Sequence, residues 1–130
     1  MICTALYVMD KNSLLQRFKP RHEDIYGSHS TIAFNPQKGI ENITIGKTHT
    51  IKILGEVFDK KCYALLVENI MSENRFPHIT ISCESGLDPY YANKLLEESY
   101  ERDTILYFED TILVSVVEGC YDGDLKREFR

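Results

Sequence analysis

The stretch THTIKILGEVFDKKCYALLVE, residues 48–68, decides the expected fold. Its two halves, Thr48–Phe58 and Cys62–Glu68, are rich in the β-branched, aromatic and aliphatic residues that are typical of strands. The short polar segment Asp59-Lys60-Lys61 between them indicates a hairpin turn. The stretch therefore predicts a fold that is built on antiparallel strands.

More strands are predicted on both sides of this hairpin. They cover Ile2–Met9, residues 29–34, His78–Ser82, Thr104–Phe108 and Thr111–Val117, with Glu109-Asp110 as a second hairpin turn. A short helix is expected over Ser13–Phe18 with Asp10 as its cap, and residues 37–47 are expected to be a loop with a short extended piece at Ile43–Ile45. Strands dominate, so the predicted class is α+β with antiparallel sheets and few helices.

The longest predicted helix covers Pro89–Tyr100. Asp88 is its expected N-cap, Pro89 occupies the first helical position, and Leu95 and Leu96 indicate the buried side. This helix follows directly after the predicted strand His78–Ser82.

Length and composition predict that residues 1–130 form a single domain with a substantial core. The chain is 43% hydrophobic and 27% charged, which argues against disorder, collagen and coiled coil. Its formal net charge is −5, and a broad basic face for nucleic acid is therefore not expected, although a small anion in a local site is not excluded.

The cysteines and the apolar runs point to a soluble cytoplasmic protein. Cys3, Cys62, Cys83 and Cys120 have no metal-knuckle or CxxC spacing, so they are expected to be small buried residues in a reducing compartment. The apolar N-terminus has no basic leader or cleavage site, and no run approaches the roughly 18–20 residues of a membrane span. No membrane partner and no obligate protein partner are expected.

One pattern occurs twice. His29-Ser30-Thr31-Ile32 and His78-Ile79-Thr80-Ile81 share the form His-x-Thr-Ile and lie 49 residues apart, both in predicted strands. Side chains at i and i+2 of a strand point the same way, so each His shares a face with its Thr, while the isoleucines turn to the core. Two imidazoles and two hydroxyls would converge if these strands were neighbours.

This set of groups suits phosphodiester chemistry. A neutral imidazole can take a proton from water while a cationic one donates a proton to the leaving oxygen, and the Thr hydroxyls can donate to phosphate oxygens. The competing interpretation is that both histidines are ordinary strand residues beside β-favouring threonines. A Ser-His-Asp nucleophile lacks its Gly-x-Ser-x-Gly elbow, and a zinc site would need a third ligand that neither His22 nor His49 is well placed to supply.

The segments SHSTIAF (residues 28–34) and PHITISCESGLDPYYANKLLE (residues 77–97) resemble the two motifs of the 2H phosphoesterase superfamily. The similarity is greatest to the cyclic phosphodiesterase type, found in 2′,3′-cyclic-nucleotide phosphodiesterases and in tRNA ligase cyclic phosphodiesterase domains. It extends over residues 2–118 and is specific only around the two motifs. It implies two sheet-containing lobes around a cleft, with one motif from each lobe. Only a short helix fits between Asp10 and Pro20, so the first lobe is expected to be reduced and its cleft open.

The resemblance also implies roles for individual residues. His29 would be the general acid and His78 the general base, an order that differs between branches of the superfamily, and Thr31 and Thr80 would hold the phosphate. Phe34 matches a position that stacks on the base, although strict strand alternation would turn it toward the core. Pro89 and Tyr90 match a loop that closes the nucleobase side, with a simple helix start as the alternative. Tyr7 is a base-contact candidate, with a core position as the alternative.

The function expected from these residues is hydrolysis of a 2′,3′-cyclic phosphate, at an RNA end or on a nucleotide, to a 2′-phosphate, with no metal or other cofactor. Two alternatives stay open: degradation of 2′–5′-linked or cyclic signalling oligonucleotides, and a non-catalytic RNA-end binding module. The cations available to a substrate are Arg75, Lys38, Lys47, Lys60 and Lys61, although surface lysines are usually only solvated.

Overall fold

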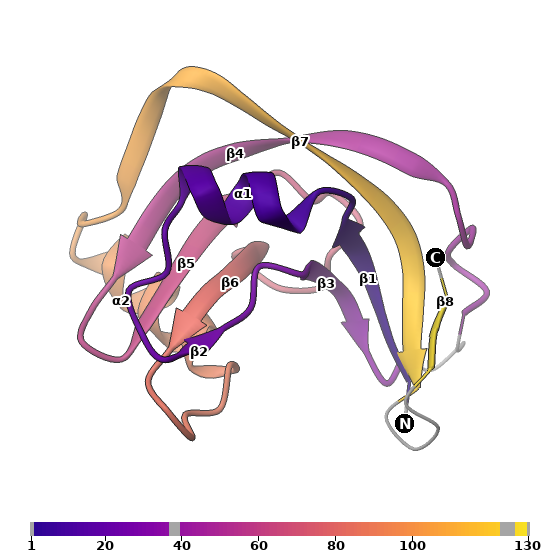
Figure 1. Cartoon of the computed structure of the whole chain (residues 1–130), viewed down its shortest axis with the longest axis horizontal. Coiled ribbons are helices and arrows are strands. Elements are labelled where there is room, and N and C mark those ends of the chain that lie inside the picture. Colours follow the sequence, from indigo (N-terminus) through magenta and orange to yellow (C-terminus); the bar gives the residue numbers. More distant parts are fainter. Residues whose placement is uncertain (1, 37–39, 123–126, 130) are drawn as a thin grey trace.

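The computed structural model describes residues 2–36, 40–122 and 127–129, which form one antiparallel sheet and two helices (Figure 1). The strands are β1 (Ile2–Val8), β2 (Asp24–Ile25), β3 (His29–Phe34), β4 (Thr48–Phe58), β5 (Cys62–Val67), β6 (His78–Cys83), β7 (Leu106–Asp122) and β8 (Arg127–Phe129). The helices are α1 (Lys11–Arg17) and α2 (Tyr91–Glu101).

The strand order is β2-β6-β5-β4-β7-β1-β3, with β8 paired to β7. All the strand pairs are antiparallel, which confirms the predicted α+β class with antiparallel pairing. The resemblance implied two sheets in two lobes, whereas the described strands belong to one continuous sheet. Long β4 and β7 cross the whole molecule and join the part around β5 and β6 to the part around β1 and β3 (Figure 1).

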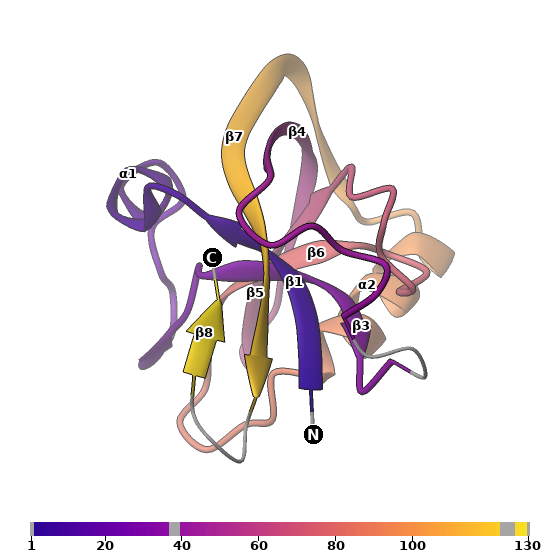
Figure 2. The same cartoon turned by 90° about the vertical axis from the view of Figure 1, so that its right-hand side faces the viewer.

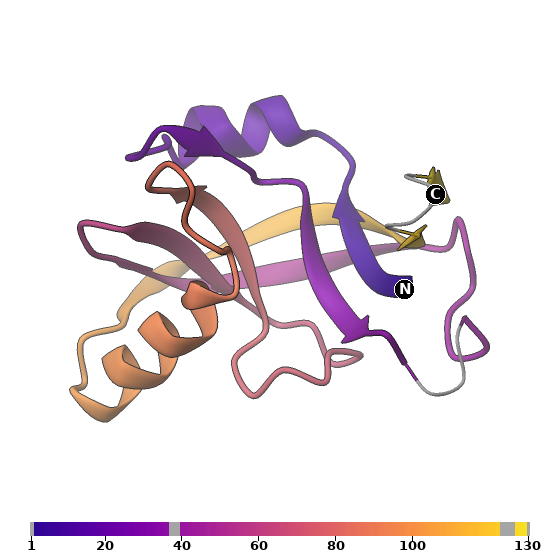
Figure 3. The same cartoon turned by 90° about the horizontal axis from the view of Figure 1, so that it is seen from below.

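The sheet curls around a single inner core. This core takes buried side chains from β1, β3, β4, β5, β6 and β7, and Leu14 and Phe18 of the α1 segment cover it. Because the sheet curls, β3 at one end of the strand order contacts β6, which lies next to the other end (Figure 3). A second cluster forms on the outer face where α2 packs against β5. We call it the α2 cluster, and its buried members are Val57, Cys62, Ala64, Leu66, Cys83, Ala92, Leu95, Leu96 and Ile105.

The strand prediction was accurate for β1, β3, β4, β5 and β6. The bounds of β3 and β4 match, those of β1, β5 and β6 differ by one residue, and the Asp59 carboxylate accepts the amides of Lys61 and Cys62 in the predicted turn. Toward the C-terminus β7 pairs with both β1 and β8, and these three strands lie side by side in Figure 2.

The hairpin predicted at Glu109-Asp110 is wrong, because β7 runs through it as one strand. Ile53 pairs with Ile112 and Gly55 with Tyr107, so a single residue of β4 lies opposite residues 108–111 of β7. Glu109 and Asp110 therefore lie in a bulge, which a polar pair can occupy without ending the strand. A side chain at Gly55 would place its Cβ 2.9 Å from the carbonyl oxygen of Leu106, so glycine suits this close approach.

Both helices are present, but α1 begins two residues before its predicted start and α2 begins two residues after its predicted start. Asp10 caps α1 as predicted, since its carboxylate accepts the amide of Ser13 at 3.1 Å. Helix α2 begins at Tyr91, so Asp88 and Pro89 precede it and form a turn in which Asp88 accepts the Tyr90 amide. The buried side predicted from Leu95 and Leu96 is confirmed.

Other sequence predictions have mixed outcomes. Residues 43–45 contain no strand, and Lys38 lies outside the described residues. Cys62, Cys83 and Cys120 are buried, as predicted, whereas Cys3 is only partly buried. Neither helix in the described part of the chain has the length and apolar character that a bilayer crossing requires.

Candidate functional site

The two His-x-Thr pairs occupy matching positions at the starts of β3 and β6. In both strands the first four residues alternate between partly exposed and buried, with the His and the Thr partly exposed and the residues between and after them buried. The alternation predicted for the two motifs is therefore confirmed. The inward residues include Ile32, Ile79 and Ile81 of the inner core, and the His and Thr side chains point to the other face of the sheet.

Hydrogen bonds place the two motif segments antiparallel to one another. The Gly27 amide donates to the Thr80 carbonyl at 2.8 Å, and the Glu73 amide donates to the Ile32 carbonyl at 2.7 Å. Residues 27–32 and 73–80 thus face each other between these two bonds, and we call this region the seam. His29 and His78 both lie within it, on segments that run in opposite directions.

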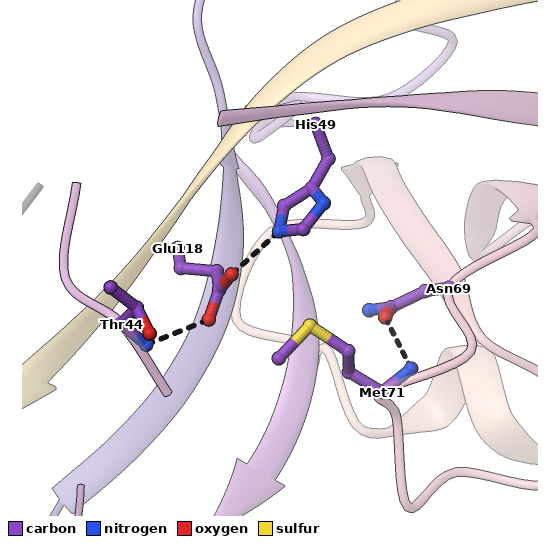
Figure 4. Close-up of polar contacts among 5 residues, drawn as sticks. All are labelled: Thr44, His49, Asn69, Met71 and Glu118. Carbon is purple, nitrogen blue, oxygen red and sulfur yellow. Dashed lines mark hydrogen bonds and ion pairs between the residues drawn. The ribbon is translucent and has the colours of Figure 1, made fainter. Parts of the chain in front are cut away.

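A buried side chain also ties the two sides of the seam together. Asn69 is 3% exposed, and its amide nitrogen donates to the hydroxyl of Ser30 at 3.0 Å, inside the first motif. Its amide oxygen accepts the Met71 amide at 3.1 Å (Figure 4). Asn69 therefore anchors the loop before β6 to β3. Sequence reasoning missed this residue because its polar loop context resembles that of any solvated asparagine.

Each motif strand contains a bulge at the same position. Along β3 the pairing with β1 jumps from Thr31 to Ala33, and along β6 the pairing with β5 jumps from Thr80 to Ser82, so Ile32 and Ile81 are the extra residues. A bulge shifts the faces of the residues that follow by one. Ala33 is buried as a result, and Phe34 turns out to the solvent with 65% of its surface exposed. Strict alternation had predicted a core position for Phe34, which is wrong because of this bulge.

The strands that flank the motifs repeat as well. Residues 3–8 of β1 read CTALYV, and residues 62–67 of β5 read CYALLV. Ala5 pairs with Thr31 as Ala64 pairs with Thr80, and Tyr7 pairs with His29 as Leu66 pairs with His78. The two halves of the site are thus equivalent strand pairs. This six-residue repeat is visible in the sequence, and it would have added support to the prediction that the two His-x-Thr motifs are equivalent.

A backbone carbonyl orients the ring of His78. Its Nδ1 lies 2.8 Å from the carbonyl oxygen of Phe76, which can only accept, so Nδ1 carries a proton and Nε2 of the neutral ring has a lone pair. Burial lowers the pKa of His78, and the bond to the Phe76 carbonyl offsets this effect only in part. The neutral form is therefore favoured near pH 7.

Ser28 and Tyr7 both contact the ring of His29. The Ser28 hydroxyl lies 2.9 Å from its Nδ1, and the ring of Tyr7 lies 5.7 Å away between centroids, tilted by 41°. Tyr7 is only 3% exposed, so it packs beneath the imidazole as a buried residue and has little accessible surface for contact with a nucleobase. The structure thus favours the alternative in which Tyr7 is a core residue.

Pro89 and Tyr90 lie at the opposite end of β6 from His78. Tyr91, the residue that follows them, donates its hydroxyl to Asp59 at 2.6 Å, next to the turn that leads to Cys62, and Cys62 pairs with Cys83. Strand β6 spans roughly 17 Å from His78 to Cys83. Pro89 and Tyr90 are exposed, and Tyr90 is 74% accessible.

A buried acid lies on β7, next to the loop that precedes β4. Glu118 of β7 is 3% exposed, accepts the Thr44 amide at 2.8 Å and pairs with Nε2 of His49 at 2.5 Å (Figure 4). Burial raises the pKa of Glu118, but the Thr44 amide and His49 outweigh it and hold this pKa below its usual value. The contacts fasten the loop before β4 to the sheet.

Three hollows of the described surface lie away from the seam. Two have volumes of about 570 and 590 Å³ and are lined by the α1 segment together with β7, and a third of about 260 Å³ adjoins His49. None of the three is lined by His29, Thr31, His78 or Thr80. Among the described residues, no group of three or more His, Cys, Asp and Glu side chains is arranged to hold a metal ion.

Comparison of the chain with family models, with curated proteins and with solved structures finds no match.

Proposed function

We propose that this protein is a phosphodiesterase of the 2H type that opens a 2′,3′-cyclic phosphate, at an RNA end or on a nucleotide, and leaves a 2′-phosphate. The observation that carries the proposal is the seam, in which two equivalent His-x-Thr pairs lie on antiparallel segments with their side chains on the less buried face. In this proposal the two lobes of the superfamily correspond to the two halves of this sheet. One half is formed around β1 and β3, and the other is formed around β5 and β6.

The state of His78 supports its role as the base. Its Nε2 takes a proton from water as the water oxygen attacks phosphorus, and its depressed pKa keeps that nitrogen unprotonated near pH 7. His29, as imidazolium, donates a proton to the 3′-oxygen as the phosphorus–oxygen bond breaks. The hydroxyls of Thr31 and Thr80 donate to the non-bridging oxygens. No step in this scheme requires a metal.

The same proposal covers partners and location. An RNA end or a small nucleotide with a cyclic phosphate is the partner class, which implies a role in RNA processing or repair. The buried cysteines support a cytoplasmic location.

The test is an assay of purified protein with 2′,3′-cyclic nucleotides in EDTA, with the product identified by phosphorus NMR. The proposal expects a 2′-monophosphate. Turnover of 2′–5′-linked or cyclic oligonucleotides in place of this substrate would instead support the alternative that the enzyme degrades signalling oligonucleotides. Tight binding of RNA ends without turnover of any substrate would refute the enzymatic proposal in favour of a binding module.

A further inference from the structure

A cationic and aromatic cluster lies immediately before His78 and is not used in the proposed chemistry. The guanidinium of Arg75 lies 4.9 Å from the ring centroid of Phe76 and 5.6 Å from that of Tyr100, and the two rings are 5.2 Å apart. Phe76 is also the residue whose carbonyl holds His78. The cluster and the candidate base are therefore parts of one local structure.

The cluster lies on the same face of the sheet as His78. The ring of Phe76 packs against the α2 cluster, which includes Leu66, the β5 residue directly opposite His78. Directly paired residues share a face of an antiparallel pair. Tyr100 comes from the C-terminal end of α2, so this end of the helix lies at the His78 end of β6.

Arg75 is held in position but is only weakly paired. Two aromatic rings support its guanidinium, which limits its freedom and leaves the donor edge available. Its only acidic contact among the described residues is Glu97 at 3.4 Å, with side chains 63% and 53% exposed. An exposed ion pair of this kind contributes little, so a phosphate can replace Glu97.

We propose that Arg75, supported by Phe76 and Tyr100, forms a subsite for the phosphate that precedes the terminal nucleotide of an RNA strand. The inference rests on the proposed function and narrows its substrate to an RNA end. Arg75 and His78 are three residues apart, so their Cα atoms are separated by at most about 11 Å. In this proposal a strand with its terminal cyclic phosphate at the seam runs toward Arg75 and places its next phosphate there, whereas a mononucleotide has no such phosphate.

The experiment compares a trinucleotide that ends in a 2′,3′-cyclic phosphate with the corresponding cyclic mononucleotide. Arg75→Gln is expected to lower kcat/KM for the trinucleotide about 5- to 10-fold and to leave the mononucleotide unchanged. Arg75→Lys keeps the charge but loses the planar stacking, and it is expected to recover only part of the loss. Lys94→Gln, which removes an exposed charge from α2, is the matched control and should change neither substrate.

A binding measurement separates this inference from the proposed function. Fluorescence anisotropy with the trinucleotide that ends in a 2′-phosphate requires no turnover. Arg75→Gln should weaken binding by a similar factor and reduce the salt dependence by about 0.7–1 in the slope of log K against log salt. Equal binding and equal slopes in wild type and Arg75→Gln would overturn the subsite even if cyclic phosphates are hydrolysed. Equal losses for the trinucleotide and the mononucleotide would overturn it too.

Discussion

The backbone amide of Gly27 donates a 2.8 Å hydrogen bond to the carbonyl of Thr80, and this bond joins the segment just before β3 to the second His-x-Thr pair on β6. Strands β3 and β6 are far apart in the strand order, and each is paired to a different neighbour, β1 and β5. The bond from Gly27 and the one from Glu73 to Ile32 bring the two motifs to one seam.

Gly27→Ala should therefore impair both stability and activity. Gly27 has a φ of +78°, and a Cβ there would lie 2.8 Å from Cδ2 of Leu15. Gly86 has a φ of +80° with open space around it, so Gly86→Ala isolates the cost of the backbone conformation. We expect a loss of about 1 kcal/mol in the free energy of unfolding for Gly86→Ala and roughly 2 kcal/mol for Gly27→Ala, measured by urea denaturation. Only Gly27→Ala should also lower kcat/KM, by about tenfold; equal effects of the two variants would contradict the account of the seam.

The pH dependence of kcat/KM should be bell-shaped. The rate rises with pH as His78 loses its proton, and because burial lowers the pKa of His78, this acid limb should lie below the ordinary value of about 6.5. The rate falls again at higher pH as the general acid loses its proton. Initial rates in EDTA from pH 4.5 to 9 test this expectation. A flat profile, or an acid limb above pH 7, would contradict the role assigned to His78.

Phe34 should contribute to binding but not to stability. Its side chain is 65% exposed, so Phe34→Ala should change the free energy of unfolding by less than about 0.5 kcal/mol. Loss of base stacking should lower kcat/KM for a cyclic nucleotide by about 5- to 100-fold. Phe34→Tyr retains a ring and should keep kcat/KM near the wild-type value. Leu113→Ala is the control for surface changes, because Leu113 is an exposed apolar residue on a different strand, β7. An unchanged kcat/KM in Phe34→Ala would remove the stacking role.

Glu118 should make stability depend on pH in the acid range. Its folded pKa lies below the unfolded value near 4.5, so its contribution is fully present above that pH and is lost as the pH falls through the folded pKa. Glu118→Gln should cost about 1–3 kcal/mol at pH 7, because the carboxylate that accepts from Thr44 and His49 is missing (Figure 4). The cost should become smaller toward pH 3, as the wild-type carboxylate takes up a proton.

Urea denaturation of wild type and Glu118→Gln at both pH values measures this difference. Glu98→Gln removes an exposed carboxylate, 42% accessible, and should have an effect below about 0.5 kcal/mol. A Glu118→Gln deficit that is the same at pH 3 and pH 7 would contradict a role that depends on the charge.

Local patterns predicted most of the strands because apolar alternation and polar turns are encoded within a few residues. The Asp59-Lys60-Lys61 turn and the bounds of β3 and β4 are of this kind. The bulges depend on partner strands, so no local signal separated the Glu109-Asp110 bulge from a hairpin or indicated that Phe34 faces the solvent.

The site was predictable only in part. The faces of the two motifs follow from strand alternation, and the structure agrees with them. The seam requires a curled sheet, which depends on how all the strands pack around the inner core. The carbonyl partner of His78 and the tie through Asn69 are tertiary contacts, and no spacing in the sequence indicates them. The repeat of CTALYV and CYALLV is the exception, since it could have been found by comparing the chain with itself.

The central claim is that His29 and His78 act together on one phosphodiester. The most direct test is the single-turnover rate of hydrolysis of a 2′,3′-cyclic nucleotide in EDTA by wild type, His29→Ala, His78→Ala and the double variant, with His49→Gln as the histidine control. The account predicts a loss of about 10²–10⁴-fold in each single variant, little further loss in the double variant, and near wild-type turnover in His49→Gln. Undiminished turnover in either single variant, with the fold intact by thermal unfolding, would contradict it.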